Sequence, residues 1–169
     1  MKDLEQMPLY NKALEIQKLV NSIIEITKAS ELKLKNEIEK AMLDEALDYL
    51  MGNSLLIPAK IAEAYADSMP YDIKMENAVL IRKAARELLT DARSVETFGF
   101  KDVDYMDVLR TEIDGFRLLF IAWVKTFDPW DYILDDWGLF NPPGIEGDAN
   151  DGPTLGEDHD YFDDDDDDF

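Results

Sequence analysis

The sequence contains no cysteine, only one histidine (His159), and no lysine or arginine after residue 125. Without cysteine there can be no disulfide and no thiolate metal site. A single histidine cannot supply the paired Glu-x-x-His motifs of a di-iron helical bundle. No Gly-rich phosphate loop occurs either, and His159 lies in an acidic tail far from any candidate nucleophile. We therefore expect no catalytic residue, no metal and no cofactor, and a protein that is not an enzyme.

Long hydrophobic runs are also missing. The opening MKDLEQMPLY lacks the apolar stretch of a signal peptide. No apolar run approaches the roughly 18 residues that a membrane-spanning helix needs. We therefore expect a cytoplasmic protein that does not enter a membrane.

Charge is distributed unevenly along the chain. The 169 residues carry 17 Lys+Arg and 38 Asp+Glu, which gives a formal net charge of −21. Residues 1–130 hold all 17 basic groups and 23 acidic groups, a sum of −6, whereas residues 131–169 hold 15 acidic groups and no basic one, a sum of −15. This division predicts one ordinary domain followed by a strongly acidic extension.

Four segments show the periodicity of amphipathic helices. The clearest stripe has spacings that alternate between three and four residues: Met106, Leu109, Ile113, Phe116, Phe120, Trp123 and Phe127. Similar stripes occur over about 9–26, 34–66 and 78–95. Pro58 interrupts the second of these, but the periodicity keeps its phase, which favours one kinked helix over two shorter ones. Residues 1–130 are therefore expected to form an all-α, antiparallel up-and-down four-helix bundle.

Two further segments follow the expected bundle. Residues 131–144 are aromatic but broken by proline and glycine, and we expect them to pack along the bundle or on a neighbouring subunit. Residues 145–169 are dominated by Gly, Asp and Pro, so few side chains could offset the entropy lost on ordering. This last segment is expected to be a disordered acidic tail.

Basic residues cluster in two places. Arg82, Lys83, Arg86 and Arg93 lie on the expected third helix, and Lys33, Lys35 and Lys40 lie near the start of the second. Three of the arginines are spaced i, i+4 and i+11, which places them on one helix face. Guanidinium groups on one face could hold RNA phosphates in bidentate fashion. The competing interpretation is that these side chains pair with Glu76, Glu87 or a neighbouring subunit, or are simply solvated.

The helices also resemble a known family. The stretches that carry the resemblance are MPLYNKALEIQKLVNSIIEI, LKNEIEKAMLDEALDYL, LIPAKIAEAYADS and NAVLIRKAARELLTDARSVETFGF. They are similar to a four-helix-bundle family that unites the accessory variability determinants of diversity-generating retroelements with proteins encoded in intervening sequences of bacterial large-subunit (23S) ribosomal RNA genes. The resemblance covers about residues 5–127, and the opening PLYNKALEIQKLV resembles the accessory group in particular.

This resemblance implies a homopentamer that binds a reverse transcriptase and its structured RNA, and that supports mutagenic complementary-DNA synthesis without being catalytic. The aromatic content agrees with this expectation, because the chain has more aromatic residues than one small bundle needs: Phe116, Phe120, Trp123, Phe127 and Trp130. Accessory members are generally basic, whereas residues 1–130 sum to −6 here. This departure from the family argues against broad, non-specific affinity for nucleic acid, but it leaves room for a local basic patch.

The end of the sequence, DYFDDDDDDF, allows three interpretations. It can be a brush that keeps the protein soluble. It can be an internal competitor that covers Arg82, Arg86 and Arg93 until RNA displaces it. It can also be a docking peptide, in which an acidic run closed by an aromatic residue binds a partner. The candidate partner-binding residues are Asp163, Asp164, Asp165, Asp166, Asp167, Asp168 and Phe169.

The leading hypothesis is thus a non-catalytic scaffold of a reverse-transcriptase ribonucleoprotein. The alternative is a protein–protein adaptor or nucleic-acid mimic that acts through its acidic tail and binds no RNA.

Overall fold

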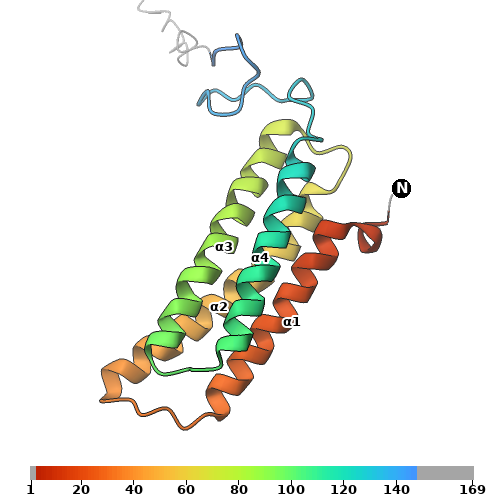
Figure 1. Cartoon of the computed structure of the whole chain (residues 1–169). Coiled ribbons are helices and arrows are strands. Elements are labelled where there is room, and N and C mark those ends of the chain that lie inside the picture. Colours follow the sequence, from red (N-terminus) through yellow and green to blue (C-terminus); the bar gives the residue numbers. More distant parts are fainter. Residues whose placement is uncertain (1–2, 148–169) are drawn as a thin grey trace, which may run out of the picture.

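The computed structural model describes residues 3–147, which form four long α-helices packed side by side (Figure 1). Each helix runs antiparallel to the one before it. Helices α2 and α4 each pack against both α1 and α3. No strand occurs in the described part of the chain, so the prediction of an all-α up-and-down four-helix bundle is confirmed. The elements are a 3-10 turn at Leu4–Gln6, α1 (Pro8–Ala29), α2 (Glu37–Ala64), α3 (Tyr71–Thr97) and α4 (Val103–Val124).

Local sequence explains where the helices begin. Helix α1 begins with Pro8 at its first position, where a missing N–H costs nothing. Helix α2 begins after Asn36, whose side-chain oxygen accepts a hydrogen bond from the Glu39 N–H at 3.0 Å. The Glu39 carboxylate in turn accepts one from the Lys35 N–H at 2.8 Å. These contacts satisfy donors that the first turn would otherwise leave unpaired.

Helix α2 continues through Pro58 as one helix of 28 residues, so the prediction of a single helix is confirmed. Pro58 has no N–H to donate to the carbonyl of Ser54, one turn earlier. Ser54 is buried at a core position, and its hydroxyl donates to the Met51 carbonyl at 2.8 Å. The helix thus keeps its apolar side toward the core on both sides of the proline.

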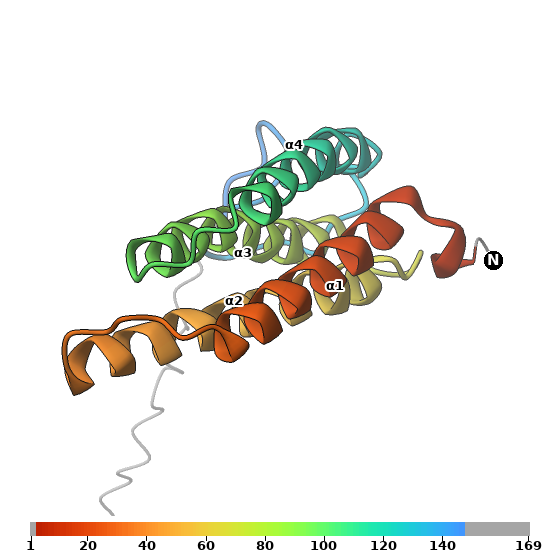
Figure 2. The ribbon, with the colours of Figure 1, turned by 60° about the horizontal axis from the view of Figure 1, so that its bottom comes forward.

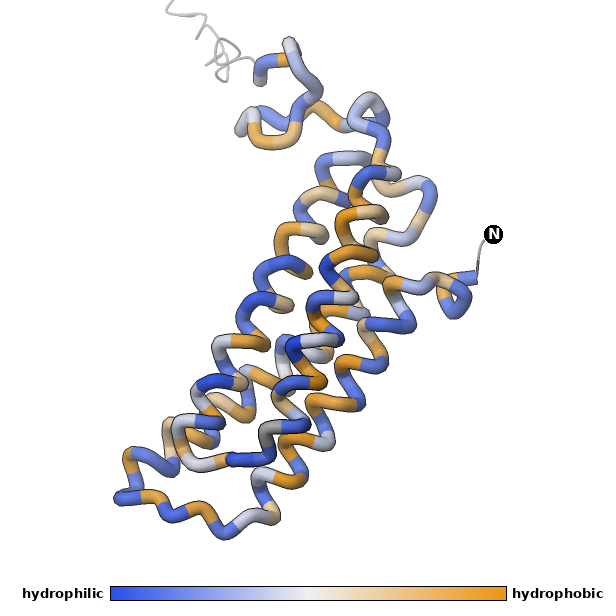
Figure 3. Tube along the Cα trace, in the orientation of Figure 1, coloured by the Kyte–Doolittle hydropathy of each residue, from blue (hydrophilic) through white to orange (hydrophobic). Residues whose placement is uncertain are grey.

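The core is formed by one apolar side from each helix. Figure 3 shows hydrophobic residues recurring along all four helices, and the side chains on the inner sides are almost fully buried. Figure 2, turned so that the bottom of Figure 1 comes forward, shows α1 and α2 together, with α3 and α4 packed over them. The largest fully buried side chains are Ile16, Ile23, Leu50, Ile57, Ile61, Ile81, Leu88, Met106, Leu109 and Phe116.

The aromatic stripe of α4 belongs to this core. Phe116 and Phe127 are buried, while Phe120 and Trp123 are half-buried. Their rings form a ladder, and the last pair, Trp123 and Phe127, meets edge to face at 4.7 Å between centroids. Only Trp130, of the five aromatic residues considered in excess, is exposed. The expectation that this stripe needs a neighbouring subunit to cover it is therefore wrong, because the bundle itself covers most of it.

Residues 125–147 follow α4 as an irregular extension. Figure 1 places it beyond the end of the bundle where α4 ends and α3 begins. Apart from the turn bonds directly after α4, one backbone hydrogen bond joins the extension to the bundle, from the Tyr71 N–H to the Asp131 carbonyl at 2.6 Å. Packing of residues 131–144 on a neighbouring subunit stays a prediction.

The acidic tail was predicted for residues 145–169, and residues 148–169 of it lie outside the described part of the chain, as do Asp163–Asp168 and Phe169. Among residues 3–147, no helix is long and apolar enough to cross a lipid bilayer.

Candidate nucleic-acid interface on α3 and α4

The three arginines predicted to share a face do lie together on α3. Arg82, Arg86 and Arg93 are all exposed. None of them makes an ion pair or a side-chain hydrogen bond with another residue in the range 3–147. At a rise of about 1.5 Å per residue, they extend over roughly 16 Å of helix. Pairing with Glu76 or Glu87 does not occur for these three side chains, whereas simple solvation and pairing with a neighbouring subunit stay open.

The side of α3 that carries these arginines faces α4. Arg110 of α4 makes two hydrogen bonds to the carboxylate of Glu96 on α3, at 2.9 and 3.0 Å, and this contact sets the register of the antiparallel pair. Two turns along each helix, the same register brings Arg117 opposite Leu89. Arg86 and Arg93 lie about one turn on either side of Leu89. Extended along the two helices, this register therefore sets Arg117 level with the stretch of α3 between Arg86 and Arg93.

Arg117 is exposed and makes no ion pair with any described residue. Sequence analysis missed it, because its helix was read only for its aromatic stripe. The sequence does show that Arg117 follows Arg110 by seven residues, which places both on one flank of α4. The sequence does not show the register that brings this flank against α3. We call Arg82, Arg86, Arg93 and Arg117 the arginine surface.

Apolar and acidic groups border the arginine surface. Ile121, one turn after Arg117 on the same flank of α4, and the neighbouring Leu118 are exposed. Along α4 the nearest acidic residue is Asp114, three residues before Arg117, while Glu112 is paired with Lys12 at 2.6 Å. Asp107 is already paired with Arg110 at 2.9 Å, and Glu96 and Asp107 together raise the pKa of that guanidinium. The arginine surface therefore keeps a local excess of positive charge beside exposed apolar groups.

The other predicted basic residues lie elsewhere. Lys83 points toward Glu87, with 3.8 Å between its amine and the carboxylate. Lys33 and Lys35 lie in the connection between α1 and α2, and Lys40 lies in the first turn of α2. These three lysines are at the end of the bundle opposite to the start of α3 (Figure 1). The structure therefore does not bring the seven predicted residues into one surface.

The opposite flank of α3, which faces α2, is acidic. The Asn53 amide on α2 donates to both Glu87 and Asp91, at 3.3 Å each. Burial raises the pKa of Asp91, the Asn53 hydrogen bond opposes this, and Glu87 raises it further. Next to these acids is a shallow pocket of about 340 Å³ that Met42, Tyr49 and Asp91 help to line. Phosphate groups would be repelled from this side, so the two flanks of one helix differ in charge.

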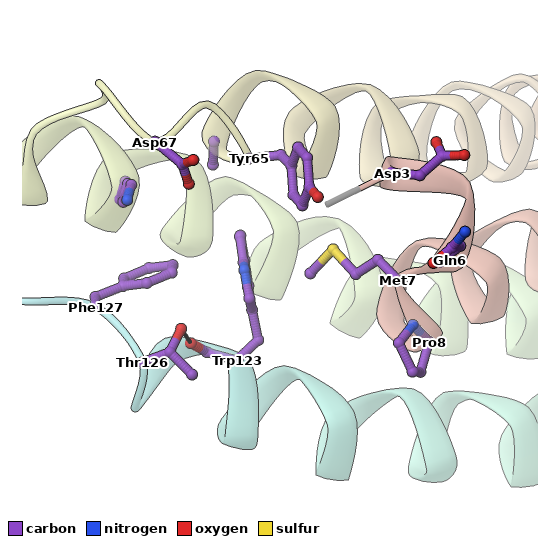
Figure 4. Close-up of a pocket in the computed structure, with 11 residues that line it drawn as sticks. Asp3, Gln6, Met7, Pro8, Tyr65, Asp67, Trp123, Thr126 and Phe127 are labelled. Atoms are coloured by element: carbon purple, nitrogen blue, oxygen red, sulfur yellow. Dashed lines mark hydrogen bonds between the residues drawn. The ribbon is translucent and has the colours of Figure 1, made fainter. Parts of the chain in front are cut away.

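A larger pocket of about 610 Å³ lies at the end of the bundle where α4 ends (Figure 4). Figure 4 shows Trp123, Phe127, Tyr65 and Met7 around it, with Asp3 and Asp67 at its rim. The Lys74 amine lies 5.8 Å from the centre of the Phe127 ring, a cation–π contact within the chain itself. Two carboxylates against one amine give this pocket a negative rim, which does not suit a phosphate.

No group of three His, Cys, Asp or Glu side chains among residues 3–147 is placed to hold a metal ion. The absence of catalytic residues and cofactors stays a prediction. No protein-family model, no curated protein and no solved structure matches this chain.

Proposed function

We propose that this chain is a non-catalytic accessory scaffold of a diversity-generating retroelement, and that it binds structured RNA through the arginine surface of α3 and α4. The observation that supports RNA binding is a set of four exposed arginines on facing flanks of two helices, with no carboxylate partner among the described residues. Arginines without carboxylate partners contribute little to the stability of a folded protein. Their clustered positive charge does, however, attract an anionic ligand.

Guanidinium groups suit RNA phosphates for two reasons. Each is planar and can donate two parallel hydrogen bonds to one phosphate. The field of this surface also acts locally, because physiological salt screens charges beyond about 8 Å. The acidic flank of α3 and the net charge of −6 over residues 1–130 therefore do not cancel it. Binding should favour a structured RNA whose phosphates match the spacing of these arginines.

The remaining parts of the proposal come from the family resemblance. They are a reverse transcriptase as protein partner, support of mutagenic complementary-DNA synthesis, a homopentamer and a cytoplasmic location. Light scattering tests the assembly: a pentamer has five times the chain mass of 19.4 kDa. A monomeric mass at micromolar concentration would rule it out.

RNA binding is tested with the full-length double variant Arg82→Glu/Arg86→Glu and a labelled RNA stem-loop. The matched control is Lys18→Glu/Lys28→Glu, which makes the same change in net charge at two exposed positions of α1. At low salt we expect the arginine variant to bind on the order of a hundredfold more weakly, since each charge-assisted contact contributes about 1.5 kcal/mol. The control should bind like the wild type. Equal losses in both variants would mean that only net charge matters.

A second candidate function is a protein–protein adaptor without RNA binding. One observation favours it: residues 126–169 contain no lysine or arginine, and several apolar side chains of the described extension are exposed. An adaptor predicts that the full chain fails to bind the stem-loop even at low salt. The scaffold predicts clear binding under that condition, so the same titration separates the two.

A further inference from the structure

The extension after α4 exposes an unusual amount of apolar surface. We call residues 128–147 the arm. Within ten residues it carries five large exposed side chains, and Trp137 is 95% exposed. Isolated exposed apolar residues are normal, but a dense group usually marks an interaction site. The five are Trp130, Ile133, Leu134, Trp137 and Leu139.

The conformation of the arm is held by its own hydrogen bonds. The Asp135 carboxylate accepts from the Trp137 N–H at 3.0 Å and from the Leu139 N–H at 2.7 Å. The Asn141 side chain bonds both the N–H and the carbonyl of Asp135, at 2.9 Å each. Gly138, at a φ of +71°, makes the turn between the two apolar side chains. The loop therefore holds Trp137 and Leu139 outward before any partner arrives.

The chain also closes on itself at the far end of the arm. A Cβ at Gly147 would lie 2.9 Å from the carbonyl oxygens of Asp135 and Asp136. The arm is thus a compact loop and not an extended strand. Because the loop is already ordered in the free chain, little further conformational entropy is lost when a partner binds it.

The charge of the arm limits what can bind it. It carries acidic residues and no basic one, so it repels RNA and favours a surface that is both basic and apolar. Two grooves of the bundle are unsuitable, because Asp3 and Asp67 rim one and Asp91 with Glu45 lines the other. The arginine surface is basic and has Leu118 and Ile121 exposed beside it. It complements the arm in both properties.

We propose that the arm of one copy docks on the arginine surface of a second copy. Trp137 and Leu139 pack against Leu118 and Ile121, while Asp131 and Asp136 face the arginines. The arm lies across the end of its own bundle, beyond α3 and α4, which directs it to a neighbour (Figure 1). Trp137, at roughly 200 Å², supplies up to about a quarter of the roughly 800 Å² that a partner buries in a stable interface.

This inference deepens the proposed function, because the docked arm covers the same arginines that RNA would contact. Arm and RNA then compete, and RNA binding is regulated by assembly. Because the arm and the arginine surface are different patches, one copy can use both at once. Such contacts close either into a ring or into a reciprocal pair.

The experiment measures mass by light scattering at a fixed micromolar concentration without RNA. The arm variant is Trp137→Ser/Leu139→Ser, and the surface variant is Arg82→Glu/Arg86→Glu. Ile38→Ser, which removes an apolar side chain that is 70% exposed on α2, is the control for the arm variant. Lys18→Glu/Lys28→Glu is the control for the surface variant. Circular dichroism checks that each variant keeps its helices.

We expect the wild type and both controls to be oligomers, and each test variant to have the chain mass of 19.4 kDa. An equimolar mixture of the two test variants should give a particle of twice that mass, since one intact arm then meets one intact surface. A monomeric wild type, variants with the wild-type mass, or a mixture that stays monomeric would each overturn the proposal. RNA binding by the arm variant separates this result from the proposed function: it should be tighter than wild type if the scaffold is correct, and absent if it is not.

Discussion

The bundle and the arm achieve order in opposite ways. In the bundle, apolar side chains are buried between helices, and Leu50, Ile57 and Leu109 have almost no exposed surface. In the arm, apolar side chains are exposed, and one aspartate holds the loop through backbone hydrogen bonds. Hydrophobic burial thus stabilises the first region and does little for the second. A single exposed apolar residue in the bundle needs no functional explanation, whereas the dense group of exposed apolar side chains in the arm does.

The two aspartates that mark these regions respond oppositely to their surroundings. Burial raises the pKa of Asp91 in the bundle. Hydrogen bonds from the Leu139 and Trp137 N–H groups lower the pKa of Asp135 in the arm. A negative charge is therefore disfavoured at the first position and is part of the structure at the second.

The largest expected effect comes from removing a buried side chain of the bundle. Leu50→Ala should lower the free energy of unfolding by about 3 kcal/mol, because it removes apolar contacts and leaves a cavity. Leu139→Ala, the same change in the arm, should alter it by less than about 0.5 kcal/mol. Urea denaturation of the two variants measures both values. Similar losses would mean that the arm is part of the core.

A smaller effect is expected from the contact that sets the α3–α4 register. Arg110→Ala removes the two hydrogen bonds to Glu96 and the pair with Asp107. Since the pair is partly exposed, the loss should be about 0.5 to 1 kcal/mol. Lys60→Ala, which breaks an ion pair with Glu63 within a single helix, is the control and should cost less. If Lys60→Ala lowered the free energy of unfolding more than Arg110→Ala, the contact between α3 and α4 would contribute no more than an ordinary surface ion pair.

The effect of Asp91 on stability should depend on pH. Its folded-state pKa is raised, so its charge destabilises the bundle above that pKa, and the penalty disappears as the pH falls toward the ordinary value of 3.8. Asp91→Asn should therefore raise the melting temperature at pH 7 and have little effect near pH 4. A melting temperature that drops at pH 7 would show that the carboxylate is needed for its Asn53 contact.

The smallest effect on global stability is expected for Asp135. Its folded-state pKa is lowered, so its contribution to arm order is present above pH 3.8 and is lost as the pH falls through the folded value. Asp135→Ala at pH 7 should leave the melting temperature unchanged but speed hydrogen exchange at the Trp137 and Leu139 amides. Protection of Leu109 in the core is the internal control. Unchanged exchange in the arm would mean that another contact holds the loop.

The fold could be predicted from the sequence because the periodicity of the helices records burial. The apolar stripe from Met106 to Phe116 correctly predicted α4, and the unbroken periodicity across Pro58 correctly predicted that α2 is one helix. The site could be predicted only in part. The spacing of Arg82, Arg86 and Arg93 within one helix is local information, but the position of Arg117 depends on how α4 is placed against α3. The compact arm depends on contacts of Asp135 with Asn141, six residues away, for which the sequence shows no period.

The most direct test of the arginine surface is the salt dependence of RNA binding. Four phosphate contacts predict a slope of log affinity against log salt of about −3, at 0.7 to 0.9 for each contact. The Arg82→Glu/Arg86→Glu variant should lose about half of that slope, and Lys18→Glu/Lys28→Glu should keep all of it. A wild-type slope near zero, or equal slopes in all three proteins, would contradict RNA binding by this surface.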